Sequence, residues 1–551
     1  IYSKRSIRIL KMRHFLLVSA FVCAVLTHTQ SLVNAATDEE ESSKKVRGSA
    51  TTTTSNKKGQ NAIVDAFFQS QSNAHAHAQV SVSVSASDKA KASKDLLDEI
   101  KLLASTENLK NFLSVTRRAL HRHPELMYQE SFTSETIQTV LDDLDIPYTT
   151  GWAKNTHEDV YPGKGGYGIV AHIGRRASGK VPGSKEDEDE AGPCVILRAD
   201  MDALPIVEQT LNVESFKSRK SGKMHACGHD GHTTMLLGAA ALLKTVEDSI
   251  QGTIRLVFQP AEEGGAGAKR MIEEGLMEME PKPQHAFGMH VWPTLPTGVI
   301  ASRPGALMAA ADTFEILMAG KGGHAAMPHL TIDPIVASSS LVMNLQTIVS
   351  RTLSPLEAGV VSVTQFAAGD AFNVIPASVV IRGTIRALSV ETLNSLRDSV
   401  EKMVEATCLL HGTNSTIKYS PDYYLPTIND PDLFEFSKEV AGMVSKEGYM
   451  RDIVPTMGGE DFSFIADAIP STFFMIGQGT GGDEKLHLPR TDYGLHHPSF
   501  SLDEDVMPVG VELHVNLALR TLAELGNGDS PSWYKKKVEN ETMEGSATAA
   551  I

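Results

Sequence analysis

The spacing of apolar residues changes repeatedly along the chain and predicts strands and helices in alternation. Uninterrupted apolar runs predict buried strands, and apolar residues three or four positions apart predict helices that bury one face. After a helical pattern that begins near Leu96, the predicted elements are a helix at 134–144, a strand at 194–200, a helix at 233–245, a strand at 253–258, a short helix at 267–274 and a strand at 285–290. This alternation predicts an α/β domain that has a mostly parallel sheet with helices on both faces.

A different order of elements follows Ala311 before the first pattern returns. The predicted elements are a strand at 314–318, a helix at 334–350, strands at 359–366 and 379–387, a helix at 390–410 and a strand at 415–419. Strand-helix-strand-strand-helix-strand is the order of a ferredoxin-like α+β unit, and about 110 residues is a suitable size for an inserted domain. The α/β pattern resumes with a helix at 433–447 and a strand at 471–476. We therefore predict a catalytic domain at 96–310 and 425–530 that is interrupted by an inserted domain at 311–424.

The first 35 residues have the pattern of a secretory signal peptide. From Met12, taken as the true start, basic residues precede an apolar stretch at 15–26 and then small residues up to Ala35. This stretch is shorter than the ~20 residues of a membrane span, although a short anchor remains an alternative. We expect a mature chain without a membrane span, in the extracellular space or the ER lumen. Few large apolar residues occur at 36–95, which predicts disorder there, and 531–551 is expected to be a flexible tail.

Composition narrows the function without identifying it. The chain has 551 residues, of which 41% are hydrophobic and 21% charged, so it can form more than one soluble domain. Its net charge of −16 argues against nucleic acid as a partner. Once Cys23 has left with the signal peptide, Cys194, Cys227 and Cys408 remain, an odd number, so at least one lies outside any intramolecular disulfide. Metal ligation would explain an unpaired thiol at Cys227 in an oxidising compartment.

Residues able to bind metal follow the ends of several predicted strands. They are Asp200 and Asp202 after the first strand, Glu262 and Glu263 after the second, and His290 at the end of the third. Residues beyond the carboxyl ends of strands gather at one edge of an open α/β sheet. A histidine such as His290 is usually structural when it stands alone, but its neighbours in this pattern favour a metal site.

Cys227 and His229 stand two residues apart on a glycine-containing turn, so both side chains can face one point. Thiolate, imidazole and carboxylate together are typical of zinc and transition-metal sites, and Asp230 or His232 would orient a ligand. In the pair Glu262-Glu263, one carboxylate would bind metal and the other would move protons during hydrolysis. Two acids at a helix N-terminus are the structural alternative. The sequence contains no P-loop, dinucleotide fingerprint or nucleophile elbow.

Ten short strings carry a resemblance to a known family. They are HRHPEL from His121, LRADMDALPI from Leu197, HACGHDGHT from His225, VFQPAEEGGAGA from Val257, GMHVWPTLPTG from Gly288, GKGGHAAMPH from Gly320, FNVIP from Phe372, GTIRAL from Gly383, GGEDFSF from Gly458 and LHHPSF from Leu495. In this order, the strings resemble the amidohydrolase branch of the aminoacylase-like metallopeptidases. That branch includes hippurate hydrolases, other N-acyl-amino acid amidohydrolases and auxin-amino acid conjugate hydrolases.

The resemblance implies a site with two divalent metal ions, manganese or alternatively zinc, that share a water. The implied ligands are Cys227, His229, Glu263, His290 and His496. Glu262 would be the general base, and Asp202 and Asp230 would orient ligands. Related metallopeptidases take a ligand from a His-X-Asp motif, but this chain has Asp200-Met-Asp202 there. Because His497 follows His496, either of these two histidines remains open as the last ligand.

The resemblance also implies that the inserted domain is a dimerisation or lid domain, and hence a homodimer. His324 would stabilise the oxyanion in its own site or in that of a partner, unless it is an ordinary loop histidine. Asn373 and Arg386 would bind the substrate carboxylate, although Arg386 also suits a surface ion pair. The implied reaction converts a small-molecule N-acyl amino acid to a carboxylic acid and a free amino acid. A dipeptidase or carboxypeptidase with the same site, and a catalytically silent binding or scaffold protein, remain alternatives.

Overall fold

The computed structural model describes residues 98, 100–174, 192–211, 213–479, 481 and 489–526. The predicted signal peptide with its start at Met12, the low-complexity region at 36–95 and the tail at 531–551 lie outside these residues. Among the helices that the structure describes, none has both the length and the apolar character that a membrane crossing requires.

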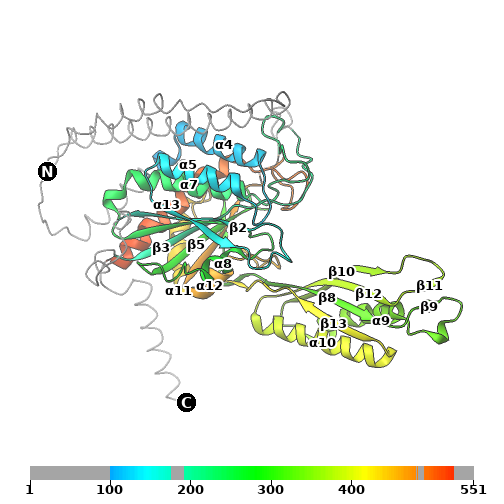
Figure 1. Cartoon of the computed structure of the whole chain (residues 1–551). Helices are drawn as coiled ribbons and strands as arrows, with labels where there is room; N and C mark the ends of the chain where they lie inside the picture. The colour runs from blue at the N-terminus through cyan, green and yellow to red at the C-terminus, as the bar shows by residue number, and fades with distance from the viewer. Residues whose placement is uncertain are drawn as a thin grey trace, which may run out of the picture.

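The larger sheet has eight strands within the described residues, in the order β1-β2-β4-β3-β5-β16-β6-β15 (Figure 1). Their bounds are β1 Tyr148–Lys154, β2 Gly165–Gly174, β3 Cys194–Asp200, β4 Thr253–Gln259, β5 Pro283–Trp292, β6 Ile300–Ser302, β15 Arg451–Asp452 and β16 Ser471–Gly477. The central strands β4, β3, β5 and β16 are mutually parallel, and β1 and β2 add an antiparallel edge. Strands that are buried on both faces are expected to be continuously apolar, which explains the runs in the sequence.

Helices cover both faces of this sheet, as the sequence predicts. One layer comprises α4 Glu107–Arg122, α5 Ser131–Asp143, α7 His229–Thr245, α11 Pro431–Val444 and α13 Met507–Gly526, and the other comprises α8 Gly267–Glu273 and α12 Ser463–Ala468. Successive residues of β3 alternate between the two cores, since Val195 and Leu197 pack in the first and Ile196 in the second. Fully burying each such side chain stabilises the fold by roughly 1.5–3 kcal/mol.

The second unit is a four-stranded antiparallel sheet in the order β10-β12-β8-β13. Its elements are β8 Ala310–Ala319, α9 Pro334–Thr347, β10 Gly359–Ala368, β12 Ser378–Ala387, α10 Val390–His411 and β13 Asn414–Tyr419. Both helices pack on the sheet around a core that includes Ile316, Leu341 and Val400. This chain order and strand order are those of the predicted ferredoxin-like unit. Figure 1 shows the unit extending away from the larger sheet, with β9 Gly323–His324 and β11 Val374–Ile375 at its far end.

Helix α7 corrects one prediction, because it begins at His229 and the sequence pattern placed its start at residue 233. Gly228 precedes it with a left-handed φ of 95°, so the loop turns there and the helix starts at once. The residues of its first turn are polar yet buried, and apolar residues begin only at Met235. The apolar periodicity therefore marks the start of the helix too late, and His229 lies in the first turn of the helix.

Candidate metal centre

The predicted ligands meet at the carboxyl edge of the parallel strands. Cys227 precedes α7, His229 begins it, and His290 lies near the end of β5. The Cys227 Sγ atom is 3.2 Å from His290 Nε2, and His496 Nε2 is 3.2 Å from Glu263 Oε1. One cluster of potential donor atoms joins Cys227, His229 and His290, and a second joins Cys227, Glu263 and His496. The two clusters would each be able to hold one divalent ion, and Cys227 could be a ligand in either of them.

The orientation of the histidine rings fits metal binding. His229 Nδ1 lies 3.2 Å from Asp202 Oδ1, and His290 Nδ1 lies 2.7 Å from the carbonyl oxygen of Val291. Each Nδ1–H therefore donates to an oxygen, which leaves the Nε2 lone pair directed at the cluster. His229 is fully buried, and its Nε2 has no hydrogen-bond partner among the described residues. A buried polar atom without a partner is costly, and a metal ion would supply the partner.

The buried carboxylates of the cluster affect the protonation of the candidate ligands, and this also favours the binding of cations. Burial raises the pKa of the Cys227 thiol well above its usual value, and the Glu263 carboxylate raises it further. Burial opposes protonation of His229, but Asp200 and Asp202 outweigh it and raise the pKa of His229 to about 10. Without metal, both groups therefore hold protons at neutral pH. Divalent ions would replace these protons, since thiolate and neutral imidazole are the forms that bind metal.

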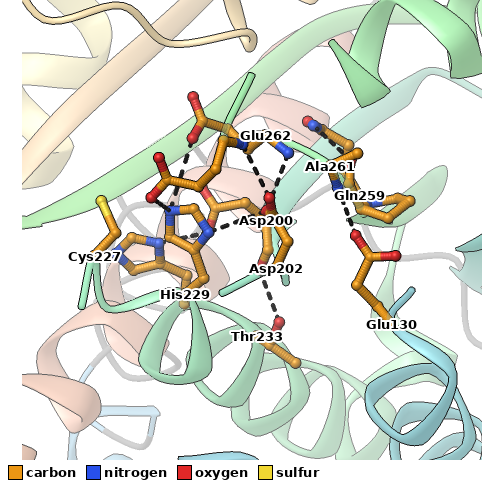
Figure 2. A network of polar contacts seen from close by, with 12 residues as sticks. Glu130, Asp200, Asp202, Cys227, His229, Thr233, Gln259, Ala261 and Glu262 are labelled. Carbon is orange, nitrogen blue, oxygen red and sulfur yellow. Dashed lines mark hydrogen bonds and ion pairs between the residues drawn. The ribbon is translucent and has the colours of Figure 1, made fainter. Parts of the chain in front are cut away.

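Asp202 lies beside His229 and connects it to the loop of Glu262 (Figure 2). Its carboxylate accepts hydrogen bonds from the backbone amides of Glu262 and Glu263, at 3.0 and 2.9 Å, and from His229 Nδ1. This one side chain thus fixes the imidazole of a candidate ligand and the backbone of both glutamates, as an orienting residue must. Asp230 differs, because it faces α4 and pairs with Arg117 Nε at 2.9 Å and His121 Nδ1 at 2.8 Å. It anchors the first turn of α7 to α4, and within the described part of the chain its carboxylate forms no hydrogen bond or ion pair with a candidate ligand.

Glu262 lies on a loop that several distant side chains hold in place. Ala261 and Ala266 have left-handed φ values of 58° and 54°, a conformation that non-glycine residues rarely adopt. The Glu130 carboxylate accepts from the amide of Ala261 at 2.9 Å (Figure 2), and the Tyr128 hydroxyl donates to the carbonyl of Gly265 at 2.5 Å. Neither Glu130 nor Tyr128 was predicted from the sequence. Both stand just after the HRHPEL string, which is the one signal that points to this region.

A buried ion-pair network supports the other side of Glu262. Arg198 on β3 pairs with Asp200, Glu460 and Asp461 at 2.8, 2.9 and 2.8 Å. Burial raises the pKa of Glu262 well above its usual value, and the nearby Glu460 carboxylate adds to the shift. No role for Arg198 or Glu460 was predicted from the sequence. Arg198 could have been recognised because it is a charged residue inside a predicted buried strand. A buried charge requires a partner, so its position indicates an ion pair.

The cluster forms the floor of a cavity of about 400 Å³. Trp292, Met308 and Leu495 give this cavity apolar surface. Arg386 reaches it from β12 of the second sheet and donates to the backbone carbonyl of Met457 at 3.0 Å. Among the described residues, Arg386 has no carboxylate partner, so its guanidinium remains available in the cavity.

The remaining predicted residues lie elsewhere. His324 and Asn373 are exposed, in β9 and just before β11, at the end of the second unit that is far from the metal ligands (Figure 1). The structure does not bring them to the cavity of the same chain. His497 stacks on Tyr493, with ring centroids 4.6 Å apart, and belongs to neither ligand cluster. Of the two adjacent histidines, His496 is the one placed beside Glu263.

Fold and site together define a two-domain metallohydrolase. Residues 196–520 match the model of "Peptidase family M20/M25/M40". The chain is 40% identical over 428 residues to "IAA-amino acid hydrolase ILR1-like 4" of Arabidopsis thaliana, which covers 77% of this chain and 88% of that protein. It therefore belongs to peptidase family M20/M25/M40 and is a metal-dependent amidohydrolase.

Two further similarities bear on the site. The chain is 36% identical over 428 residues to "Thermostable carboxypeptidase 1" of Saccharolobus solfataricus, with 77% of this chain and 99% of that protein covered. Among solved structures, it resembles the Bacillus subtilis YXEP protein, described as a dinuclear metal-binding peptidase of the M20 family. That match has a TM-score of 0.58 and 33% identity, and it covers 76% of this chain and 99% of the other. The clusters in this chain likewise support two divalent metal ions.

We expect the Asp202→Asn variant to bind metal about ten- to hundredfold more weakly, the range typical for loss of a residue that orients a ligand. Asparagine keeps one acceptor oxygen, but its amide nitrogen cannot accept, so the hydrogen bonds from His229 and from the backbone of both glutamates can no longer all be formed. Metal titration against a chelator measures this change. Asp492→Asn is the control, since Asp492 forms an exposed ion pair with Arg490. Equal affinity in D202N and wild type would contradict the orienting role.

Proposed function

We propose that this enzyme hydrolyses N-acyl amino acids to a carboxylic acid and a free amino acid. One observation carries the proposal: a single cavity contains the ligand cluster with Glu262 and also the available guanidinium of Arg386. In an N-acyl amino acid, the amide bond lies one carbon from a carboxylate. Arginine is well suited to bind that carboxylate in a bidentate manner while the amide lies over the cluster.

We assign Cys227, His229, Glu263, His290 and His496 as the ligands of two divalent ions. When bound, such ions polarise the amide carbonyl and lower the pKa of an attacking water. Manganese is the ion we propose, on the resemblance to relatives, with zinc as the alternative. A donor set of one thiolate, three imidazoles and one carboxylate suits either ion.

Glu262 is proposed to move the proton. Its carboxylate takes a proton from the water as the water oxygen attacks the carbonyl carbon. It then gives that proton to the amide nitrogen as the carbon–nitrogen bond breaks, which releases the amine and the carboxylic acid. Burial raises the pKa of Glu262, and Glu460 adds to this, which makes its carboxylate a stronger base and so favours accepting the proton.

The cavity supports an acyl substrate over a peptide with a free amine. An α-ammonium group near the cluster needs an acidic partner. Besides the two glutamates of the proposed site, three acids line the cavity, and each has a basic partner. Asp312 pairs with Arg397 at 2.9 Å, Asp422 with Lys269 at 2.8 Å and Glu460 with Arg198 at 2.9 Å. The dipeptidase alternative therefore lacks an unpaired carboxylate among these three acids. The presence of Glu262 and all assigned ligands also argues against a silent scaffold.

Replacing each adjacent glutamate should separate proton transfer from metal binding. We expect Glu262→Gln to retain both metal ions and to lose about 10²–10⁴-fold in kcat, the usual contribution of a general base. Glu263→Gln should instead lose metal, because this carboxylate lies beside His496. Metal analysis and turnover of a panel of N-acyl amino acids and dipeptides measure both effects. Wild-type kcat in E262Q would refute the role of Glu262, and cleavage of dipeptides alone would refute the acyl substrate.

Loss of the Arg386 guanidinium should weaken the binding of only those substrates that carry a carboxylate. We expect Arg386→Gln to raise KM for an N-acyl amino acid about 10- to 100-fold, as expected for loss of a hydrogen bond to a charged group. KM for the methyl ester of the same compound should match that of wild type. Arg382→Gln is the control, because Arg382 lies on the same strand and pairs with exposed Glu315. An equal effect of R386Q on acid and ester would show that Arg386 does not bind the carboxylate.

We further propose that the enzyme is a homodimer in which the second unit supplies His324 and Asn373 to the cavity of the partner. The exposure of both residues, far from the cavity of their own chain, supports this arrangement. Apolar side chains around them are also exposed, namely Met327, Leu330, Phe372 and Val374. Exposed apolar groups of this kind often mark an interface.

Mixing two inactive variants tests whether His324 acts in the cavity of the partner subunit or in the cavity of its own chain. We expect His324→Ala and Glu262→Gln each to be nearly inactive and a subunit-exchanged mixture to regain up to about a quarter of wild-type turnover, because half of the dimers are mixed and each has one complete site. Turnover after exchange, with the dimer verified by light scattering, is the measurement. If exchange occurs and no activity returns, His324 acts within its own chain.

A further inference from the structure

The return connection from the second unit to the larger sheet is fixed against the outgoing one. Tyr424 follows β13, and Ala311 lies at the start of β8. Their backbones exchange two hydrogen bonds, of 2.8 and 3.0 Å. The junction between the two units is therefore a short paired segment, and the position of Tyr424 is set by both connections.

From this junction, the Tyr424 side chain enters the loop of Glu262. Its hydroxyl accepts from the amides of Gly264 and Ala266 at 2.9 and 3.3 Å and donates to the carbonyl oxygen of Glu262. The side chain is buried, and its ring lies so close to Gly459 that a Cβ added there would be 3.3 Å from Cδ2. The phenol thus adds three hydrogen bonds to the two backbone hydrogen bonds that the loop forms within itself, from Gly264 to Glu262 and from Gly267 to Ala261.

A second contact ties the same connection to the helix after the loop. Asp422 is buried and pairs with Lys269 at 2.8 Å and with Arg270. Both basic residues belong to α8. The connection therefore holds the Glu262 loop through Tyr424 and its following helix through Asp422.

The loop depends on such contacts because its backbone is strained. Left-handed residues such as Ala261 and Ala266 persist only where their surroundings over-determine them. The carbonyl that accepts from Tyr424 belongs to Glu262 itself, so loss of the phenolic hydroxyl removes one of the contacts that hold the peptide unit of the proposed base. The amide of Gly264, at 2.7 Å, and the Asp202 carboxylate remain as its other contacts. A small displacement of a catalytic group can cost about 10²-fold in rate.

We propose that Tyr424 is a positioning residue, through which the junction of the two units holds the Glu262 carboxylate in its reactive orientation. This inference rests on the proposed role of Glu262. It assigns a function to a residue that contacts only the backbone of the loop. It also means that a change in the angle between the units would act on the base through the Tyr424 hydroxyl.

The test compares Tyr424→Phe with Tyr423→Phe in the full-length, metal-loaded enzyme. Both variants remove one hydroxyl from adjacent residues, and the Tyr423 ring lies under Arg397, with 5.0 Å from the guanidinium carbon to the ring centroid. We expect Y424F to lower kcat about 10- to 100-fold, to keep KM within about threefold and to keep both metal ions. Hydrogen–deuterium exchange at 261–267 should become faster in Y424F only, because the amide of Ala266 loses its acceptor.

Unchanged exchange or unchanged kcat in Y424F would overturn the proposal, as would a loss of kcat that parallels a loss of metal. The exchange measurement needs no substrate, so it still tests the contact if wild type cleaves no N-acyl amino acid. If Y424F does not fold, Asp422→Asn replaces it, because it weakens the link to Lys269 from the same connection. The same faster exchange and lower kcat are expected there, and wild-type values in D422N would then overturn the proposal.

Discussion

The structure depends on a group of buried carboxylates that has too little positive charge nearby. Arg198 supplies one positive charge to Asp200, Glu460 and Asp461, all of them buried. Removing charges from water costs several kcal/mol each unless partners compensate, and one guanidinium cannot neutralise three acids. Protonation relieves part of the imbalance, since burial, only partly offset by Arg198, raises the pKa of Asp461 to about 7. The remaining negative charge makes the edge of the sheet a place where divalent cations are favoured.

The same constraint explains why the site is built from distant segments. Each acid requires a donor, and within a parallel sheet those donors come from neighbouring strand ends and from loops that cross the edge. Asp200 accepts from His232 Nδ1 at 2.6 Å, while His232 Nε2 accepts from the amide of Val291 at 3.0 Å, beside His290. One carboxylate thus fixes the backbone next to a ligand on another strand. The ligands cannot take these positions before the sheet has formed, so the site and the fold depend on each other.

The residues that could be predicted from the sequence are those that stand at a recognisable position, such as the end of a strand. Glu262, Glu263 and His290 stand where apolar strands end, and both unit folds follow from the order of strands and helices. The sequence could not predict Glu130 or Tyr424, because they act on the backbone of a loop more than a hundred residues away. Apolar periodicity records which face of an element is buried and carries no information about a hydrogen bond to a remote amide. The start of α7 was misplaced for a related reason, since a polar first turn looks like a loop until its buried partners are known.

The presence of a cysteine among the candidate ligands is related to the same excess of buried negative charge. The resemblance implies a histidine ligand where this chain has Asp200, and Asp200 instead pairs with Arg198 and His232. A donor is then missing beside His290, and the sulfur of Cys227 lies 3.2 Å from His290 Nε2, in position to replace it. A thiolate carries a negative charge where an imidazole would carry none. Because burial raises the pKa of the Cys227 thiol, ionisation there requires strong compensation, which two divalent ions held by the clusters would supply more fully than one. A cysteine in place of histidine is therefore an electrostatic argument for a binuclear site.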